Sequence, residues 1–138
     1  AAADESVHSA GGVSEIIRWE PLGVVANISA WNYPYFVGSN VFAPALLAGN
    51  AVLYKPSEHA ALTGKAIVKR MAEAGVPANV MFGVFGAGEV GAELLKLPVD
   101  GIFFPGSHAV GVKVAEAAAK FGENMVVARI ARFELGKK

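Results

Sequence analysis

Polar residues that could bind or activate a small molecule follow apolar runs at several points of the chain. Five such segments are AWNYP (30–34), KPSE (55–58), GAGEVG (86–91), FPGS (104–107) and FELGKK (133–138). The runs before them are short and apolar, most of them with β-branched residues, which is typical of buried strands. Parallel strands end at one edge of their sheet, and ligands of such folds bind at that edge. The segments are therefore candidate parts of one binding site.

Three of these segments carry charged or amide side chains suited to a polar ligand. In KPSE, Lys55 and Glu58 could bracket vicinal hydroxyl groups, because a carboxylate accepts hydrogen bonds and an ammonium group donates them. The same residues could instead be a helix-capping segment with a solvated ion pair. The Asn32 amide could donate to a developing oxyanion, or Asn32 could be a turn residue. Glu134 could act as a base on water, or be a surface acid.

Two glycine-containing turns could hold a phosphate at a helix N-terminus. GAGEVG, with Gly88 at its centre, matches the G-x-G-x-x-G pattern of dinucleotide-binding loops and lies between a strand-like and a helical pattern. It lacks the acidic residue that this fingerprint places near the end of the next strand, which favours a plain strand-to-helix turn. Gly106 and Ser107 open the next helical pattern, where Ser107 could simply cap the helix or could contact a phosphate.

Apolar runs alternate with helical patterns along the chain, and this alternation predicts the fold. Strands are expected over 22–28, 51–54, 80–85, 101–104 and 125–133, and helices over 35–47, 60–74, 89–95 and 108–120. The pattern predicts an α/β fold that is Rossmann-like and doubly wound, a mostly parallel sheet of about five strands with helices on both faces. Residues 1–14 are small and polar and are expected to form a tail or linker, with the domain over 15–138.

Composition limits the possible functions. The 12 basic and 12 acidic side chains cancel, so there is no sign of the basic clusters that bind nucleic acid or an anionic membrane. The 138 residues include no cysteine, which excludes a thiolate ligand or nucleophile among them and fits a reducing compartment. The three histidines have no companion ligands, so no metal site is expected. No apolar run could span a membrane and the first residues are not a secretory signal, so we expect a cytoplasmic location.

Taken in order, these segments resemble the cofactor-binding domain of the aldehyde dehydrogenase superfamily. The resemblance rests on EPLGVV, WNYP, PALLAGNAVLYKPSE, GVP, FFPGS and ELG, and it covers about Ile16 to Lys138. That family oxidises aldehydes to acids with NAD(P) through a cysteine thioester. The resemblance implies a partial NAD(P)-binding domain that prefers NAD to NADP. It also implies a homo-oligomeric complete enzyme, acting on an aldehyde that the sequence does not identify.

The resemblance also implies roles for individual residues. Asn32 is similar to the family's oxyanion-stabilising asparagine, and Glu134 is similar to its general base. Lys55 and Glu58 resemble the pair that holds the adenosine ribose, where a glutamate would repel the 2′-phosphate of NADP. The other implied cofactor contacts are Ile28, Trp31, Gly106, Ser107, Leu135 and Gly136. Gly88 is a further candidate from the glycine pattern, although the family's cofactor pose need not use it.

The chain also departs from the family pattern. Ala30 stands where the family usually has proline, Pro105 where it has threonine, and Lys137 where it has glycine. Without a cysteine, these 138 residues are not expected to oxidise an aldehyde alone. The alternative hypothesis is a non-catalytic dinucleotide-binding or protein-interaction module derived from the family. Its apolar content, 54% of residues, would then serve a partner or self-association.

Overall fold

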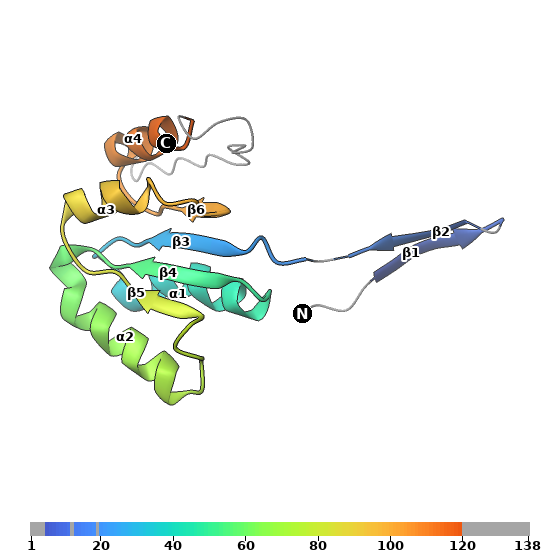
Figure 1. Cartoon of the computed structure of the whole chain (residues 1–138), viewed down its shortest axis with the longest axis horizontal. Coiled ribbons are helices and arrows are strands. Elements are labelled where there is room, and N and C mark those ends of the chain that lie inside the picture. Colours follow the sequence, from blue (N-terminus) through green and yellow to red (C-terminus); the bar gives the residue numbers. More distant parts are fainter. Residues whose placement is uncertain (1–4, 12, 19, 120–138) are drawn as a thin grey trace, which may run out of the picture.

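The computed structural model describes residues 5–11, 13–18 and 20–119. Its body is a four-stranded sheet in the order β5-β4-β3-β6 (Figure 1), formed by β3 (Val24–Ile28), β4 (Ala51–Lys55), β5 (Met81–Gly83) and β6 (Gly101–Phe103). Every pairing within this sheet is parallel. The predicted α/β fold with a mostly parallel sheet is confirmed. The strand predicted over 125–133 lies outside the described residues.

A helix follows each strand of the four-stranded sheet. They are α1 (Pro34–Leu47), α2 (Ala61–Glu73), α3 (Gly88–Leu94) and α4 (His108–Ala119), and the short 3-10 turn η1 (Glu58–Ala60) precedes α2. Pro34 begins α1 at the position where a missing backbone N–H removes no helical hydrogen bond. Gly75 follows α2 with a φ of +95°, a left-handed conformation that ends a helix without strain only for glycine.

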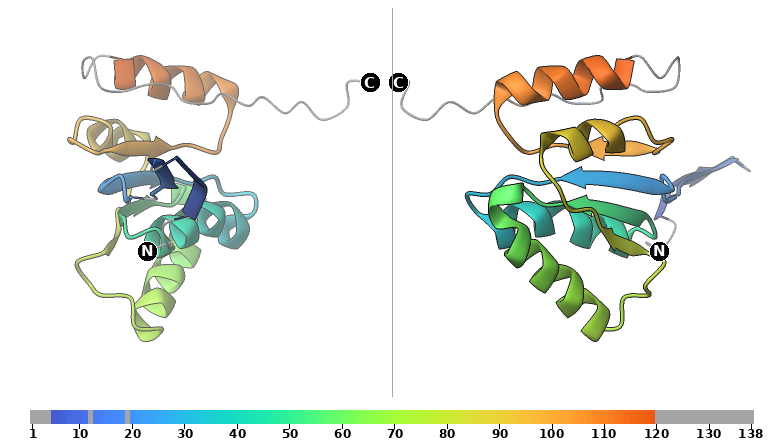
Figure 2. Two further views of the ribbon diagram at one scale, coloured as in Figure 1. Left: turned by 90° about the vertical axis from the view of Figure 1, so that its right-hand side faces the viewer. Right: turned by 60° about the vertical axis from the view of Figure 1, so that its left-hand side comes forward.

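The helices cover both faces of the sheet (Figure 2). On one face α1 and α2 close a core formed by Val25, Phe42, Val52, Tyr54, Ile67 and Met81. Val25 and Val52 are neighbours in the parallel register and are fully buried there. Lys55 points to the other face, where its side chain lies against Gly91 of α3. Successive residues of a strand alternate between faces, which is why β4 contributes both to the core and to the opposite side.

Side chains at the edge where the strands begin hold three strands in register. Asp100 Oδ2 accepts a hydrogen bond from Val24 N at 2.7 Å, and Asp100 N donates to Val24 O at 2.7 Å. Asn50 Oδ1 accepts from Gly23 N at 3.0 Å, and Asn50 Nδ2 donates to Ala45 O at 3.0 Å. These bonds fix the starts of β3, β4 and β6 relative to one another.

The first residues of the chain differ from the sequence-based expectation. Where the sequence indicates a tail or linker over residues 1–14, β1 (Glu5–Ala10) and β2 (Val13–Ile17) form an antiparallel hairpin. The hairpin extends away from the four-stranded sheet (Figures 1 and 2). Gly11 supplies a φ of +61° at the turn, and a Gly-Gly pair between two runs is a known hairpin signal. The boundary of the domain at residue 15 stays a prediction.

Candidate functional site

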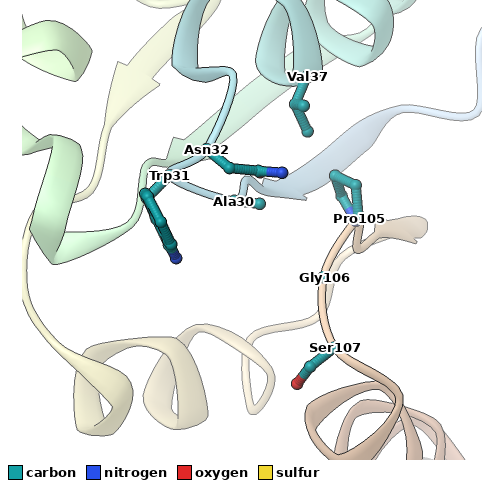
Figure 3. Close-up of a pocket in the computed structure, with 7 residues that line it drawn as sticks. All are labelled: Ala30, Trp31, Asn32, Val37, Pro105, Gly106 and Ser107. Carbon is teal, nitrogen blue, oxygen red and sulfur yellow. The ribbon is translucent and has the colours of Figure 1, made fainter. Parts of the chain in front are cut away.

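A cleft of about 410 Å³ opens at the edge where the strands end (Figure 3). It lies between the loop after β3 and the loop after β6, and its walls are Ala30, Trp31, Asn32, Val37, Pro105, Gly106 and Ser107. The chain runs from β3 outward through β4 to β5, and then returns to place β6 on the other side of β3. The cleft therefore lies where the strand order reverses, which is where doubly wound sheets bind ligands.

The two walls of the cleft carry side chains of different chemical character. Trp31 and Ser107 point from opposite sides toward the same open space, and Asn32 points across toward Pro105 (Figure 3). Trp31 is 61% exposed, so its aromatic faces can take up an apolar or planar group. Asn32 is also exposed and offers an amide that can both donate and accept hydrogen bonds.

The loop after β4 contacts Trp31, although none of its residues lines the cleft itself. The rings of Trp31 and His59 meet edge to face with their centroids 6.4 Å apart. Ser57 caps the turn that follows, because its Oγ accepts from His59 N at 3.3 Å. The pKa of Glu58 lies below its usual value, first because its own backbone N–H donates to the carboxylate, and then because Lys55, His59 and Ser57 favour the charged form. Glu58 is exposed, so it presents an ionised carboxylate beside this aromatic pair.

Lys55, the predicted partner of Glu58, is buried, whereas Glu58 is exposed. Its side chain is only 4% exposed and passes along Gly91 of α3, where a Cβ would lie 3.4 Å from Lys55 Cε. Lys55 Nζ donates to Pro56 O over a long 3.4 Å. An ammonium group has three protons to donate, so Nζ can bind further acceptors on a ligand. A lysine held in this way is a fixed positive charge at the end of β4.

The second wall is built on the start of α4. Ser107 O accepts the first helical hydrogen bond, from Gly111 N at 2.9 Å, which makes Ser107 the residue that caps the helix. The N–H groups of the first turn that have no helical acceptor lie directly after it, and they suit a negatively charged group. A Cβ at Gly106 would collide with the ring of Phe104, so a larger residue here would have to displace that ring.

These groups fit a dinucleotide. An ionised carboxylate and an ammonium group can bind ribose hydroxyls, an exposed indole can pack against a ring, and a helix N-terminus can face a pyrophosphate. Ile28, another predicted contact, ends β3 beside Lys55 in the register. Gly88 begins α3, is exposed, and is not among the residues that line the cleft.

The glycine pattern around Gly88 has a structural explanation. Gly86 has a φ of +154°, and a Cβ there would collide with Val90. Gly91 provides room for the Lys55 stem. The turn and the packing thus account for the spacing that resembles a dinucleotide fingerprint.

The site residues predicted from the sequence do not include every residue of the cleft, and three of them lie outside the described part of the chain. Val37 lies one helical turn after Pro34, a spacing that could have identified it. His59 follows KPSE directly but was considered only as a metal ligand. Glu134, Leu135 and Gly136 lie outside the described residues.

Residues 5–11, 13–18 and 20–119 offer neither a cluster of metal ligands nor a membrane-spanning helix. Within these ranges no group of three or more His, Cys, Asp or Glu side chains is placed to hold a metal ion. Within the same ranges no helix has the length and apolar character needed to cross a membrane.

Fold and cleft together define a Rossmann-like α/β domain, and comparisons with known proteins define its family. The aldehyde dehydrogenase family model matches residues 1–135. Betaine aldehyde dehydrogenase 2 of Rhizobium meliloti (strain 1021) is 43% identical over 122 residues, which are 88% of this chain and 24% of that protein. The chain therefore belongs to the aldehyde dehydrogenase family, as the sequence motifs indicated.

Solved structures agree with this assignment. The crystal structure of a Mycobacterium tuberculosis aldehyde dehydrogenase complexed with NAD+ is 40% identical, with a TM-score of 0.78 over 85% of this chain and 24% of that one. The structure of PnpE in complex with nicotinamide adenine dinucleotide is 37% identical, with a TM-score of 0.77 and the same two shares of 85% and 24%. The chain spans about a quarter of the length of these relatives.

Proposed function

We propose that this chain is the cofactor-binding portion of an NAD-dependent aldehyde dehydrogenase. The observation that supports this most is the cleft at the reversal of strand order. Its walls bring Trp31 and Asn32 close to Gly106 and Ser107, two segments about 75 residues apart in the sequence. The two NAD complexes among the structural relatives support the choice of ligand.

In this proposal, residues that end or follow the strands hold the dinucleotide. Glu58 accepts hydrogen bonds from the adenosine ribose and Lys55 donates to it, while Ile28 and Trp31 line the groove. The N-terminus of α4 at Gly106 and Ser107 faces the phosphates. Leu135 and Gly136 would lie near the nicotinamide, and Gly88 is a further candidate contact. The ionised Glu58 carboxylate would repel a 2′-phosphate, which supports NAD over NADP.

In the complete enzyme, a cysteine from outside these 138 residues would add to the aldehyde, the adduct would lose its hydride to become a thioester, and water would then cleave the thioester to the acid and the free thiol. Bound NAD supplies the hydride acceptor. The Asn32 amide donates to the oxygen that becomes negatively charged, and Glu134 takes a proton from the attacking water. The 138 residues contain no cysteine, so we expect no aldehyde oxidation by this chain alone. We further propose a cytoplasmic, homo-oligomeric complete enzyme.

The alternative is a non-catalytic dinucleotide-binding or interaction module of the same descent. It is favoured by the large apolar side chains that α1 and α2 expose, among them Tyr35 at 64%, Phe36 at 66% and Leu62 at 82%. Such surface is typical of a protein interface. Size-exclusion chromatography tests this alternative, because a monomer at all concentrations would contradict self-association.

Calorimetric titration of the chain with NAD tests the main proposal. We expect saturable binding that weakens about tenfold in Glu58→Ala, because the variant loses hydrogen bonds to a charged acceptor. Glu93→Ala is the matched control, since Glu93 is an exposed carboxylate of α3 that pairs with Lys96 away from the cleft. No binding by a folded chain would contradict the proposal for these residues alone.

A further inference from the structure

A fully buried polar side chain lies directly beneath the loop that carries Trp31 and Asn32. Asn27 is the last but one residue of β3 and is 0% exposed. Its Nδ2 donates to Gly38 O, within α1, at 2.9 Å. The loop of residues 29–33 is the only chain between β3 and α1. The side chain of Asn27 therefore links the end of β3 to the fifth residue of α1, across this loop.

Neighbouring contacts show how closely the two elements are held. Gly38 is buried, and a Cβ on it would lie 3.0 Å from the Tyr54 hydroxyl oxygen and ring, so a larger residue would fit here only if Tyr54 gave way by a few tenths of an ångström. Tyr54 is the register partner of Asn27, and its ring meets Phe42 of α1 edge to face at 5.4 Å. Ser29 N donates to Lys55 O at 2.9 Å, which fixes the first residue of the loop to β4.

Stability alone does not explain an amide at this position. Asn27 Oδ1 and the Tyr54 hydroxyl are buried and have no hydrogen-bond partner. Burial also raises the pKa of Tyr54, an effect that the nearby Ser29 side chain partly opposes. Burying a polar atom without a partner is unfavourable, and an apolar residue such as the Val25 and Val52 on the same face would avoid that cost. What the amide adds is a directional bond that selects one position for α1.

We infer that Asn27 is a positioning residue for the candidate site. Through Gly38 it fixes the start of α1 relative to the end of β3, and it thereby sets where Trp31 and Asn32 stand in the cleft. The effect on NAD binding rests on the proposed function, whereas the effect on the order of the loop does not.

The experiment compares Asn27→Leu, which keeps the size of the side chain and removes the donor, with two control variants of the full chain. Tyr54→Phe removes a hydroxyl beside Gly38 and keeps the Asn27 bond. Ile67→Val trims a buried side chain of α2 and weakens the same core. NMR relaxation of the loop amides and of the Trp31 indole measures order, urea unfolding measures stability, and calorimetry measures NAD affinity.

We expect increased motion of the loop in Asn27→Leu alone, with NAD binding about fivefold weaker, because one hydrogen bond is lost. This should hold whether the variant is less or more stable than the unmodified chain. Both controls should keep a rigid loop and an NAD affinity within about twofold of the original.

A loop that stays as ordered in Asn27→Leu as in the original chain would overturn the inference. If Asn27→Leu does not fold, NMR relaxation of the unmodified chain still tests the inference. The inference requires the loop amides to be as rigid as those of α1, with order parameters of roughly 0.8 or more. If the unmodified chain binds no NAD, the proposed function fails for this chain, and the order of the loop still tests Asn27.

Discussion

The two edges of the same parallel sheet use their polar residues in opposite ways. At the edge where the strands begin, Asn50 and Asp100 make short hydrogen bonds to the backbone, at 2.7 to 3.0 Å. At the edge where the strands end, the polar contacts of Lys55 and Glu58 are long, at 3.4 Å to Pro56 and Ser57. Trp31, the largest side chain of the cleft, is mostly exposed there.

Polar residues at the first edge stabilise the fold, whereas polar residues at the second edge can bind a ligand. A side chain whose donors and acceptors are already satisfied by the backbone has little to offer a ligand, whereas one with spare capacity gains from binding. Substitutions at the first edge should therefore change stability, and substitutions at the second edge should change affinity.

The largest effect is expected for Gly23→Ala at the first edge. Gly23 has a φ of +128°, and a Cβ there would collide with the Asp100 carboxylate. We expect a loss of about 3 kcal/mol in the free energy of unfolding, measured in urea. Gly75→Ala is the control, because Gly75 also has a positive φ, +95°, but nothing within 4 Å, and should lose only about 1 kcal/mol. Equal losses in the two variants would show that the contact with Asp100 is unimportant.

Asn50→Ala should have the next largest effect. The substitution leaves Gly23 N and Ala45 O without their side-chain partner, at a cost of about 2 kcal/mol in urea unfolding. Asn40→Ala on the exposed surface of α1 is the control and should stay within about 0.5 kcal/mol of the original. If Asn50→Ala is as stable as the control, the first edge does not hold the strands as described.

At the second edge, Trp31→Ala should weaken NAD binding about fivefold, because the cleft loses its aromatic surface. The free energy of unfolding should change little, since Trp31 is 61% exposed. Tyr33→Ala is the matched control, since Tyr33 is 67% exposed in the same loop but does not line the cleft. Equal effects of both variants on calorimetric affinity would contradict a specific role for Trp31.

The smallest effect concerns the protonation of Glu58. Its pKa is lowered in the folded chain, so its ionised form contributes stability that is present above the ordinary value of 4.5 and is lost as the pH falls through the lower folded value. The carboxyl carbon of Glu58, followed by NMR against pH, should titrate with a midpoint below 4.5. Ser57→Ala removes one of the stabilising groups and should move the midpoint upward. A midpoint at or above 4.5 in the original chain would contradict the assignment.

Most of the sheet could be predicted because its signals are local. The runs around Val25 and Val52 are rich in apolar residues, and each is followed by a segment with a proline, which cannot donate to a ladder. The run over 80–85 was predicted too long, since β5 ends at Gly83 and the ring of Phe85 folds back against that glycine. The hairpin β1–β2 was missed because β1 is mostly polar, although the Gly-Gly turn was a usable signal.

The candidate site was predictable to the extent that it follows strand ends. Asn32 and Ser107 lie in one cleft because parallel strands share an edge, a rule that needs only the order of elements. The burial of Lys55, the contact between Trp31 and His59, and the bond from Asn27 to α1 depend on three-dimensional packing between segments distant in the sequence. A single sequence carries no local pattern for such contacts.

The strand order also has a consequence for how the molecule assembles. β3, β4 and β5 follow one another along the chain and lie side by side, whereas β6 reaches β3 across 76 residues, the separation of Val24 and Asp100. Contacts between distant segments carry a larger loop-closure entropy and form more slowly. We therefore expect β3, β4 and β5 to form first with α1 and α2, and β6 to dock afterwards. During refolding, protection of the core amides should precede the ability to bind a ligand, because the second wall of the cleft forms only when β6 docks.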